Sequence, residues 1–291
     1  MIQEIRIKNY LSFRDEVVLS FEATKDTTFE VCQVVNVTPK VRLLRFALIY
    51  GANASGKSNL LNAMDFLRGF WFDKKSDIDE ETGVVPFLLD TETPNEPSEF
   101  NIKFFVGDKR YWYALVLDDK QVIKEDLYVY NSVQPSLVFS RKLDGTASLI
   151  KLNASLVKAN ATIVEQLNVK CLSNMSFFAA RNQVNCSLAY IDEVRDWMKN
   201  NMMPIIEPGT RMFEYAGKQM EKNAELKAYI LDFVHKADYN ITDVYTEREK
   251  MPIPDFVKAS IMEDKDIPEK TKEKMLADNA LERLRTDFQH T

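Results

Sequence analysis

The stretch LIYGANASGKSNLL, residues 48–61, constrains this chain more than any other feature of its sequence. Gly51 is followed after four residues by Gly56, Lys57 and Ser58, which is the spacing of a phosphate-binding loop. Glycine at the first two positions allows backbone conformations in which successive N–H groups turn inward around an anion. A helix that starts directly after the loop points its positive end at the same place. The pattern therefore predicts a nucleotide phosphate site.

The residues on either side of the loop support this interpretation. RFALIY, residues 45–50, is a short apolar run of the kind expected for a strand buried on both faces. After the loop, apolar residues recur at helical spacing, namely Leu60, Met64, Leu67 and Trp71. Strand, loop and helix in this order are the context in which the motif binds phosphate, so we expect a P-loop α/β fold.

Roles for the loop residues follow from their chemistry. The Lys57 ammonium can reach the β- and γ-phosphates, and the Ser58 hydroxyl is the expected Mg²⁺ ligand. The predicted nucleotide-binding residues are Gly51, Asn53, Ala54, Ser55, Gly56, Lys57, Ser58 and Asn59.

Composition excludes some classes of protein. Hydrophobic residues make up 45% of the 291 residues, which is enough for a sizeable core. No stretch approaches the roughly 18 consecutive apolar residues that span a bilayer. The start, MIQEIRIKNY, is charged and alternating, unlike a signal peptide. These features predict a cytoplasmic protein with no membrane partner.

The charge balance and the cysteines narrow the site chemistry. The formal net charge is −6, from 38 basic and 44 acidic residues, which argues against a broad nucleic-acid-binding surface but leaves a local basic groove open. The three cysteines, Cys32, Cys171 and Cys186, are widely spaced and give no disulfide framework. Only two histidines accompany them, which disfavours a zinc site. We expect these cysteines to be small buried hydrophobic residues.

Periodicity gives the order of elements. The first 50 residues read as strands, and alternation from about residue 98 to 152, with turn signals at residues 107–109 and 144–146, predicts an antiparallel meander. The chain then becomes helical. Helices are expected at 160–168, 188–202, 218–237 and, on the surface, 268–288, with a short strand at 240–249.

ATP hydrolysis would require an acidic residue at the end of a second apolar strand and a group that positions water. LAYIDE, residues 188–193, ends in Asp192 and Glu193, and LSNMS, residues 172–176, superficially resembles the signature of ABC-type ATPases. LSNMS, however, has no glycine to let backbone N–H groups approach a phosphate. The residues around Asp192 keep helical spacing, which favours a solvated helix face. We therefore find neither a Walker B strand nor a signature motif, and the catalytic residues stay unassigned.

Two segments give the chain a family resemblance. IQEIRIKNYLSFRDEVVLSFEA (2–23) followed by ALIYGANASGKSNLLNAM (47–64) resembles the start of AAA15-type ATPases, which are ABC-type proteins related to the heads of SMC and RecF proteins. Softer matches follow in order at VVPFLLD (84–90), PSEFNIKFFVGDKRYWYAL (97–115) and FVHKADYNITDV (233–244). The resemblance thus covers most of the chain.

The resemblance implies an ABC/SMC-like head with an antiparallel β subdomain and a helical insertion, and ATP with Mg²⁺ held between two heads. Residues 1–152 would form the N-terminal lobe, and residues 153–291 the insertion and the start of an incomplete C-terminal lobe. The adenine or ribose would lie near the turn NYLSFRD, at Ser12, Phe13 and Arg14; alternatively, Phe13 is a core residue of that turn. Many relatives act in bacterial anti-phage or abortive-infection systems beside a nuclease or toxin.

The family places its signature, its Asp-Glu strand and its switch histidine after the helical insertion, and the chain stops near that point. An N-terminal fragment, a truncated gene product or one part of a split ATPase is therefore expected, with hydrolysis deficient in this chain. Two alternatives stay open: a non-hydrolysing nucleotide-sensing scaffold for a partner protein, and a RecF-like DNA-repair ATPase fragment.

Overall fold

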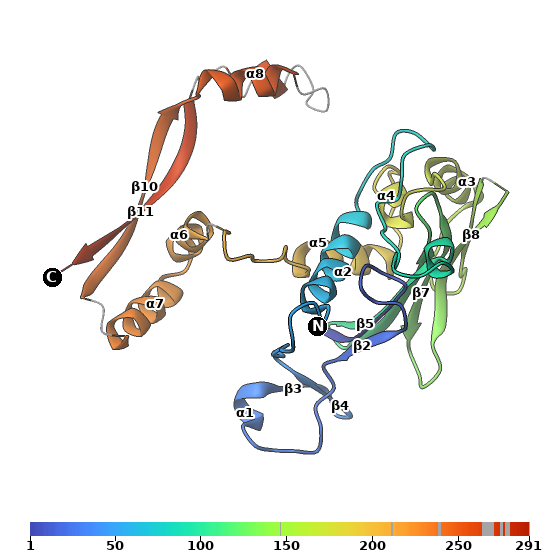
Figure 1. The fold of residues 1–291 in the computed structure, drawn as a ribbon, viewed down its shortest axis with the longest axis horizontal. Coiled ribbons are helices and arrows are strands. Elements are labelled where there is room, and N and C mark those ends of the chain that lie inside the picture. Colours follow the sequence, from blue (N-terminus) through green and yellow to red (C-terminus); the bar gives the residue numbers. More distant parts are fainter. Residues whose placement is uncertain are drawn as a thin grey trace. The chain divides into compact units, whose positions relative to one another are not determined.

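The computed structural model describes residues 1–145, 147–210, 212–237, 240–263, 271–273, 276 and 280–290 (Figure 1). The chain divides into two compact units, Met1–Ile205 and Ile206–Thr291. The predicted lobe boundary at residue 152 falls inside the first unit, because helices that follow it pack on the same core as the preceding strands. The division into ABC-type lobes stays a prediction.

A seven-stranded antiparallel sheet organises the first unit, in the order β2-β1-β5-β6-β7-β8-β9. Its last five strands are consecutive in the chain and confirm the meander predicted for residues 98–152. Short hairpins between them set the register, so that each strand faces the next residue by residue. The strands are β1 (Ile2–Lys8), β2 (Val17–Ser20), β5 (Ser98–Val106), β6 (Lys109–Leu117), β7 (Val122–Tyr130), β8 (Ser136–Asp144) and β9 (Ala147–Leu152).

One face of this sheet forms the core together with the helices. In β5, Phe100, Ile102 and Phe104 are fully buried and alternate with partly exposed polar residues. The same cluster contains the buried face of the helix after the loop, with Leu60 and Leu67. Burying each such side chain contributes about 1.5–3 kcal/mol before entropy is considered. The helices are α2 (Lys57–Phe70), α3 (Ala161–Lys170), α4 (Phe177–Arg181) and α5 (Ile191–Asn201).

A buried ion pair crosslinks the end of the sheet to the chain that follows it. Arg141 of β8 and Glu125 of β7 are both fully buried, with Nη1 and Oε2 3.2 Å apart. Glu125 also accepts hydrogen bonds from the Tyr113 hydroxyl, the Ser176 hydroxyl and the Phe177 N–H. Arg141 donates to the carbonyl oxygens of residues 172, 173 and 175. The segment LSNMS is therefore held against the sheet by this ion pair, together with a hydrogen bond from the Val122 N–H to the Ser173 carbonyl.

The segment Arg45–Tyr50 differs from its prediction as a strand buried on both faces. It is no strand, and no backbone hydrogen bond joins residues 46–50 to another element in the described part of the chain. Leu48 and Tyr50 are 81% and 93% exposed. A strand of this type needs hydrogen-bonded neighbours and a layer on each face. The seven-stranded sheet supplies neither, so the prediction is wrong for the described residues.

The remaining elements before the loop are short. Helix α1 (Glu30–Gln33) and the hairpin β3 (Val34–Thr38) and β4 (Val41–Leu44) replace the single strand expected at residues 31–37. The 3-10 turn η1 (Thr93–Asn95) precedes β5. Cys171 is buried as expected, whereas Cys186 is partly exposed and Cys32 is exposed. The expectation that all three cysteines are buried is therefore corrected.

The second unit contains α6 (Phe213–Lys222), α7 (Ala224–Lys236), β10 (Ile241–Pro252), α8 (Asp255–Glu263) and β11 (Ala280–His290). The helix predicted at 218–237 is two helices, because Asn223 interrupts it and caps α7 by accepting from the Leu226 N–H. The surface helix predicted at 268–288 is wrong from residue 280 onward, where β11 pairs with β10. That long antiparallel pairing outweighs the helical pattern of the sequence. The remainder of that prediction falls partly on residues outside the described ranges.

No helix in the described ranges combines the length and apolar character needed to cross a bilayer.

Candidate functional site

The predicted phosphate loop forms a tight turn at the start of α2. Gly56 adopts a φ of +88° and Ala54 a φ of +61°, so two loop residues occupy the left-handed region. Helix α2 begins at Lys57 with no side chain capping its first turn and no acidic residue in it. Its first N–H groups and its positive end are therefore available to an anion. These features fit a nucleotide phosphate.

Lys57 folds back over the loop. Its ammonium donates hydrogen bonds to the carbonyl oxygens of Gly51, at 2.9 Å, and Ala52, at 2.6 Å. Ser58 is exposed beside it, and Gly51 to Ser55 are exposed as well. No hydrogen bond or ion pair connects a carboxylate to Lys57 or Ser58 in the described ranges. The cation is thus placed beside the loop without a competing side-chain anion.

The turn NYLSFRD lies directly against the loop. A Cβ at Gly56 would come within 2.8 Å of both Phe13 Cε1 and Ser12 Oγ. The Asn59 side chain also donates to Ser12 Oγ at 2.8 Å. Phe13 is 9% exposed and belongs to the core. The structure therefore brings Ser12 and Phe13 to the loop. Phe13 is also a core residue of the turn, which was the alternative prediction for it.

Arg14 points elsewhere. Its side chain is 58% exposed, and its Nε lies 3.4 Å from an oxygen of Asp90. The hydrogen bond from Thr93 is the largest cause that lowers the pKa of Asp90, and the charge of Arg14 adds to it. This contact joins the turn to the segment that contains VVPFLLD.

Asn9 anchors the turn NYLSFRD through buried hydrogen bonds. The sequence alone did not identify it as a residue of the site. It is fully buried with a φ of +51°. Its amide donates to the carbonyl oxygens of Thr93 and Glu96, and its Oδ1 accepts from the Phe87 N–H. Asparagine tolerates the left-handed conformation better than most residues. An Asn directly after the alternating strand β1 was the available signal.

Tyr10 connects the turn to α2. Its ring packs edge-on against Phe100 with centroids 5.2 Å apart, and its hydroxyl donates to the Asn62 carbonyl at 3.3 Å. Burial, assisted by the charge of Asp65, raises the pKa of Tyr10 to about 12. The hydroxyl therefore stays protonated and keeps its donor role at neutral pH.

Asp192 and Glu193 are occupied by structural contacts. They lie in the first turn of α5, and Leu188, Ile191, Val194 and Met198 are all fully buried, which confirms the predicted helical spacing. Asp192 accepts from Arg181 and from the Leu188 N–H. Glu193 accepts from Lys109 at 2.8 Å and from the Tyr111 hydroxyl at 3.1 Å. The pair is ion-paired to the sheet and to α4, not freely solvated as predicted.

Comparison with known proteins gives one family match. The model of the family described as "AAA domain, putative AbiEii toxin, Type IV TA system" matches residues 46–151. A search of the curated proteins finds no match. The matched range begins at the exposed apolar segment, contains the whole phosphate loop and ends in β9. The match and the loop geometry together support an AAA-like P-loop ATPase domain in this part of the chain.

Proposed function

We propose that this chain is the ATP-binding part of an ABC-type, AAA15-like ATPase head in a bacterial anti-phage or abortive-infection system. The observation that carries the proposal is the uncapped start of α2 behind a loop in which Gly56 adopts a positive φ. The family described as a toxin-type AAA domain supports the defence role.

Binding would use the residues already placed at the loop. Backbone N–H groups from Gly51 to Ser58 would surround the phosphates, as in other phosphate-binding loops. Lys57 would exchange its two carbonyl contacts for the β- and γ-phosphates, because an anion is a stronger partner for an ammonium than a neutral carbonyl. Ser58 would hold Mg²⁺, and that ion would neutralise phosphate charge.

We further propose that the described residues alone do not complete a hydrolytic site. The candidate acids Asp192 and Glu193 are ion-paired in α5. The segment 46–50 exposes apolar side chains directly before the loop, and its backbone groups have no hydrogen-bond partner among the residues that the structure describes. Another part of the assembly could place a strand with an acidic end beside this segment. Such a strand would pair with the backbone of residues 46–50 and would supply the missing catalytic acid. An association of two heads around ATP, with a nuclease or toxin protein as partner, is the arrangement expected from the resemblance.

The same observations support a non-hydrolysing alternative. A module that binds ATP and signals occupancy to a partner protein needs the loop and Lys57 but no catalytic carboxylate. The absence of any carboxylate bonded to Lys57 or Ser58 across the described ranges favours this alternative over a self-sufficient ATPase.

Calorimetry with ATP and Mg²⁺ tests the binding. The unchanged chain is expected to bind, and Lys57→Ala is expected to lose at least about tenfold in affinity, since it removes a charged phosphate contact. The melting temperature of Lys57→Ala should stay unchanged, because within the described ranges the Lys57 ammonium hydrogen-bonds only to two carbonyl oxygens of its own loop. Lys199→Ala, at a lysine on α5, is the matched control. Equal ATP affinity in the unchanged chain and Lys57→Ala would refute the assignment.

A further inference from the structure

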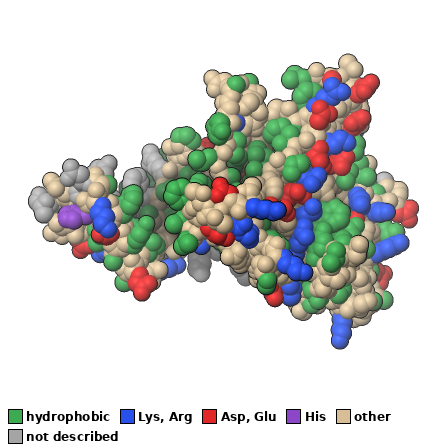
Figure 2. All heavy atoms as spheres, turned by 90° about the horizontal axis from the view of Figure 1, so that it is seen from below, with side chains coloured by type: hydrophobic (Ala, Val, Ile, Leu, Met, Phe, Trp, Pro, Cys, Tyr) green, Lys and Arg blue, Asp and Glu red, His purple; other side chains and the backbone are tan. Residues whose placement is uncertain are grey.

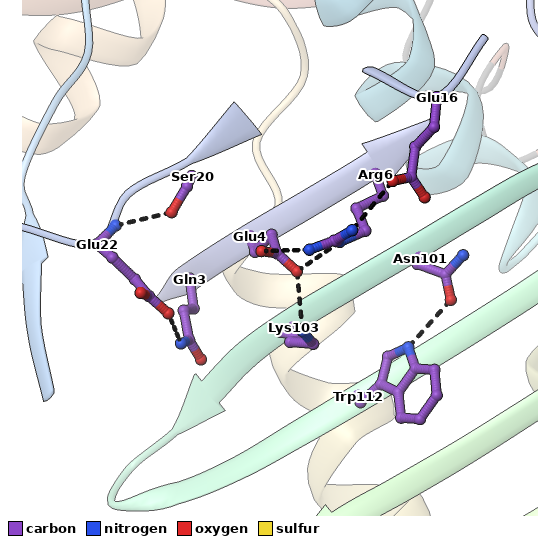
Figure 3. A network of polar contacts seen from close by, with 9 residues as sticks. All are labelled: Gln3, Glu4, Arg6, Glu16, Ser20, Glu22, Asn101, Lys103 and Trp112. Carbon is purple, nitrogen blue, oxygen red and sulfur yellow. Dashed lines mark hydrogen bonds and ion pairs between the residues drawn. The ribbon is translucent and has the colours of Figure 1, made fainter. Parts of the chain in front are cut away.

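The outward face of the seven-stranded sheet carries a set of side chains that neither the core nor the loop uses. Cross-strand register places Glu4, Lys103, Trp112, Tyr128 and Leu137 in one row, from β1 to β8. The next row runs Arg6, Asn101, Ala114, Asp126, Ser140 and Lys151. Figure 3 shows Glu4, Arg6, Asn101, Lys103 and Trp112 on one side of the sheet. The helices that share the core contribute to the opposite face.

The outward face of the sheet carries more basic than acidic residues, whereas the chain as a whole has more acidic ones. Its basic residues are Arg6, Lys8, Lys103, Arg110, Lys124, Lys142 and Lys151. Its acidic residues are Glu4, Glu99, Asp126 and Asp144, and Glu16 is ion-paired to Arg6 at its edge. The chain has a formal net charge of −6, so the excess of basic residues here reflects segregation. In Figure 2, Lys and Arg side chains stand among Asp, Glu and hydrophobic ones in the right-hand part of the view, where Figure 1 draws the sheet.

Among the described residues, most acids of this face are ion-paired, whereas three of its bases are not. Glu4 pairs with Arg6 and Lys103, Glu99 with Lys8, and Asp126 with Lys124. The described residues place no carboxylate within ion-pair distance of the three other bases. These are Arg110, Lys142 and Lys151.

Two lysines are directly opposed. Lys124 of β7 and Lys142 of β8 are register partners on the same face. Like charges directly opposite each other destabilise a sheet. Asp126 offsets the charge of Lys124 at 3.1 Å, but Lys142 is exposed and lies diagonal to Lys151, which faces Ser140 from β9. A bound polyanion would relieve this repulsion.

Partly exposed aromatic rings lie beside the positive charges. Trp112 and Tyr128 are stacked with centroids 4.7 Å apart and planes 19° from parallel. The Arg110 guanidinium lies 4.4 Å from the centroid of Tyr130, and its buried Nε has no hydrogen-bond partner in the described ranges. Aromatic side chains on an open sheet, next to a basic track, form the platform on which unpaired bases stack.

We propose that the outward face of this sheet binds single-stranded nucleic acid. Phosphates contact Lys142, Lys151 and Arg110, and bases stack at Trp112 and Tyr130. A flat sheet face favours an unpaired strand over a duplex, because only unpaired bases expose their rings to the aromatic side chains. This inference does not depend on ATP binding at the loop.

Fluorescence anisotropy of a labelled oligothymidylate, at about 50 mM salt where phosphate contacts are strong, tests the electrostatic part. Lys142→Glu/Lys151→Glu is expected to weaken binding at least about tenfold, since two phosphate contacts become repulsive. Lys158→Glu/Lys170→Glu changes the same charge at two exposed lysines outside the sheet and should leave affinity unchanged. Equal losses in the two variants, or no binding by the unchanged chain, would overturn the proposal.

Tryptophan fluorescence tests the stacking. Of the chain's three tryptophans, Trp71 is fully buried and Trp197 is 7% exposed, so quenching by the oligothymidylate should come from Trp112. Trp112→Phe should keep binding and abolish the quenching. Quenching that persists in Trp112→Phe, tighter binding of a duplex of equal length, or full competition by polyglutamate would each refute single-strand recognition at this face.

Discussion

The Asn59 side-chain amide donates a 2.8 Å hydrogen bond to Ser12 Oγ, so a residue of the N-terminal turn holds the first turn of the helix behind the loop. The same hydroxyl would lie 2.8 Å from a Cβ built on Gly56. The turn is itself fixed by the buried Asn9 and its bonds to residues 87, 93 and 96. Loop geometry therefore depends on packing between three separate segments of the chain.

Gly56→Ala should damage both binding and stability. The new Cβ would meet Phe13 and Ser12, and alanine at a φ of +88° is strained by about 1–3 kcal/mol. ATP affinity should fall at least about tenfold, because phosphate-loop N–H groups act only when preorganised. Gly69→Ala is the matched control: apart from its chain neighbours and the backbone of α2, no described atom lies within 4 Å of its Cβ, and alanine within α2 should add about 0.5–1 kcal/mol of stability. Denaturant unfolding and calorimetry measure both effects, and a Gly56→Ala variant with unchanged affinity would contradict the role of this packing.

Removing one partner of the buried Glu125–Arg141 pair should cost about 3–5 kcal/mol of unfolding free energy. Arg141→Met leaves the Glu125 carboxylate buried without its cation and removes the hydrogen bonds from Arg141 to the carbonyl oxygens of residues 172, 173 and 175. Lys8→Met, which breaks a surface pair with Glu99, should cost less than about 1 kcal/mol. Urea unfolding of both variants provides the comparison. Similar costs at the two sites would show that the buried pair does not anchor residues 172–176.

Acid should remove a contribution to stability made by Glu4. The hydrogen bond from Arg6, with help from Lys103, lowers the pKa of Glu4 from 4.5 to about 2. A depressed folded-state pKa stabilises the protein above the unfolded value and is lost as pH falls through the folded value. The stability difference between the unchanged chain and Glu4→Gln should therefore be largest above pH 4.5 and shrink as pH falls toward about 2. Urea unfolding between pH 6 and pH 3 gives this difference, and a pH-independent difference would disprove the linkage.

Local patterns identified much of this fold. Helical spacing from Leu60 to Trp71 and strict alternation in β5 predicted elements whose stability comes from burying one face, and both are present. The anchoring role of Asn9 was not predictable, because its partners at residues 87, 93 and 96 lie 78 to 87 residues away in the sequence. The apolar run before Gly51 predicted a buried strand, but burial also depends on partners that the run does not specify. The strand at residues 280–290 could not be predicted for the same reason, since it depends on pairing with β10, which is distant in the sequence.

Steady-state phosphate release should show no turnover by this chain above the Lys57→Ala background. The loop can bind and position phosphates, but stabilising the transition state also requires a strand-end acid on the metal and an oriented water. Glu193 accepts from Lys109 and from the Tyr111 hydroxyl, which are structural contacts in α5 and β6. Glu193→Gln is therefore expected to lower thermal stability and to leave phosphate release unchanged. If the unchanged chain turned over ATP and both Lys57→Ala and Glu193→Gln abolished that turnover, Glu193 would be the catalytic acid and the site would be complete within this chain.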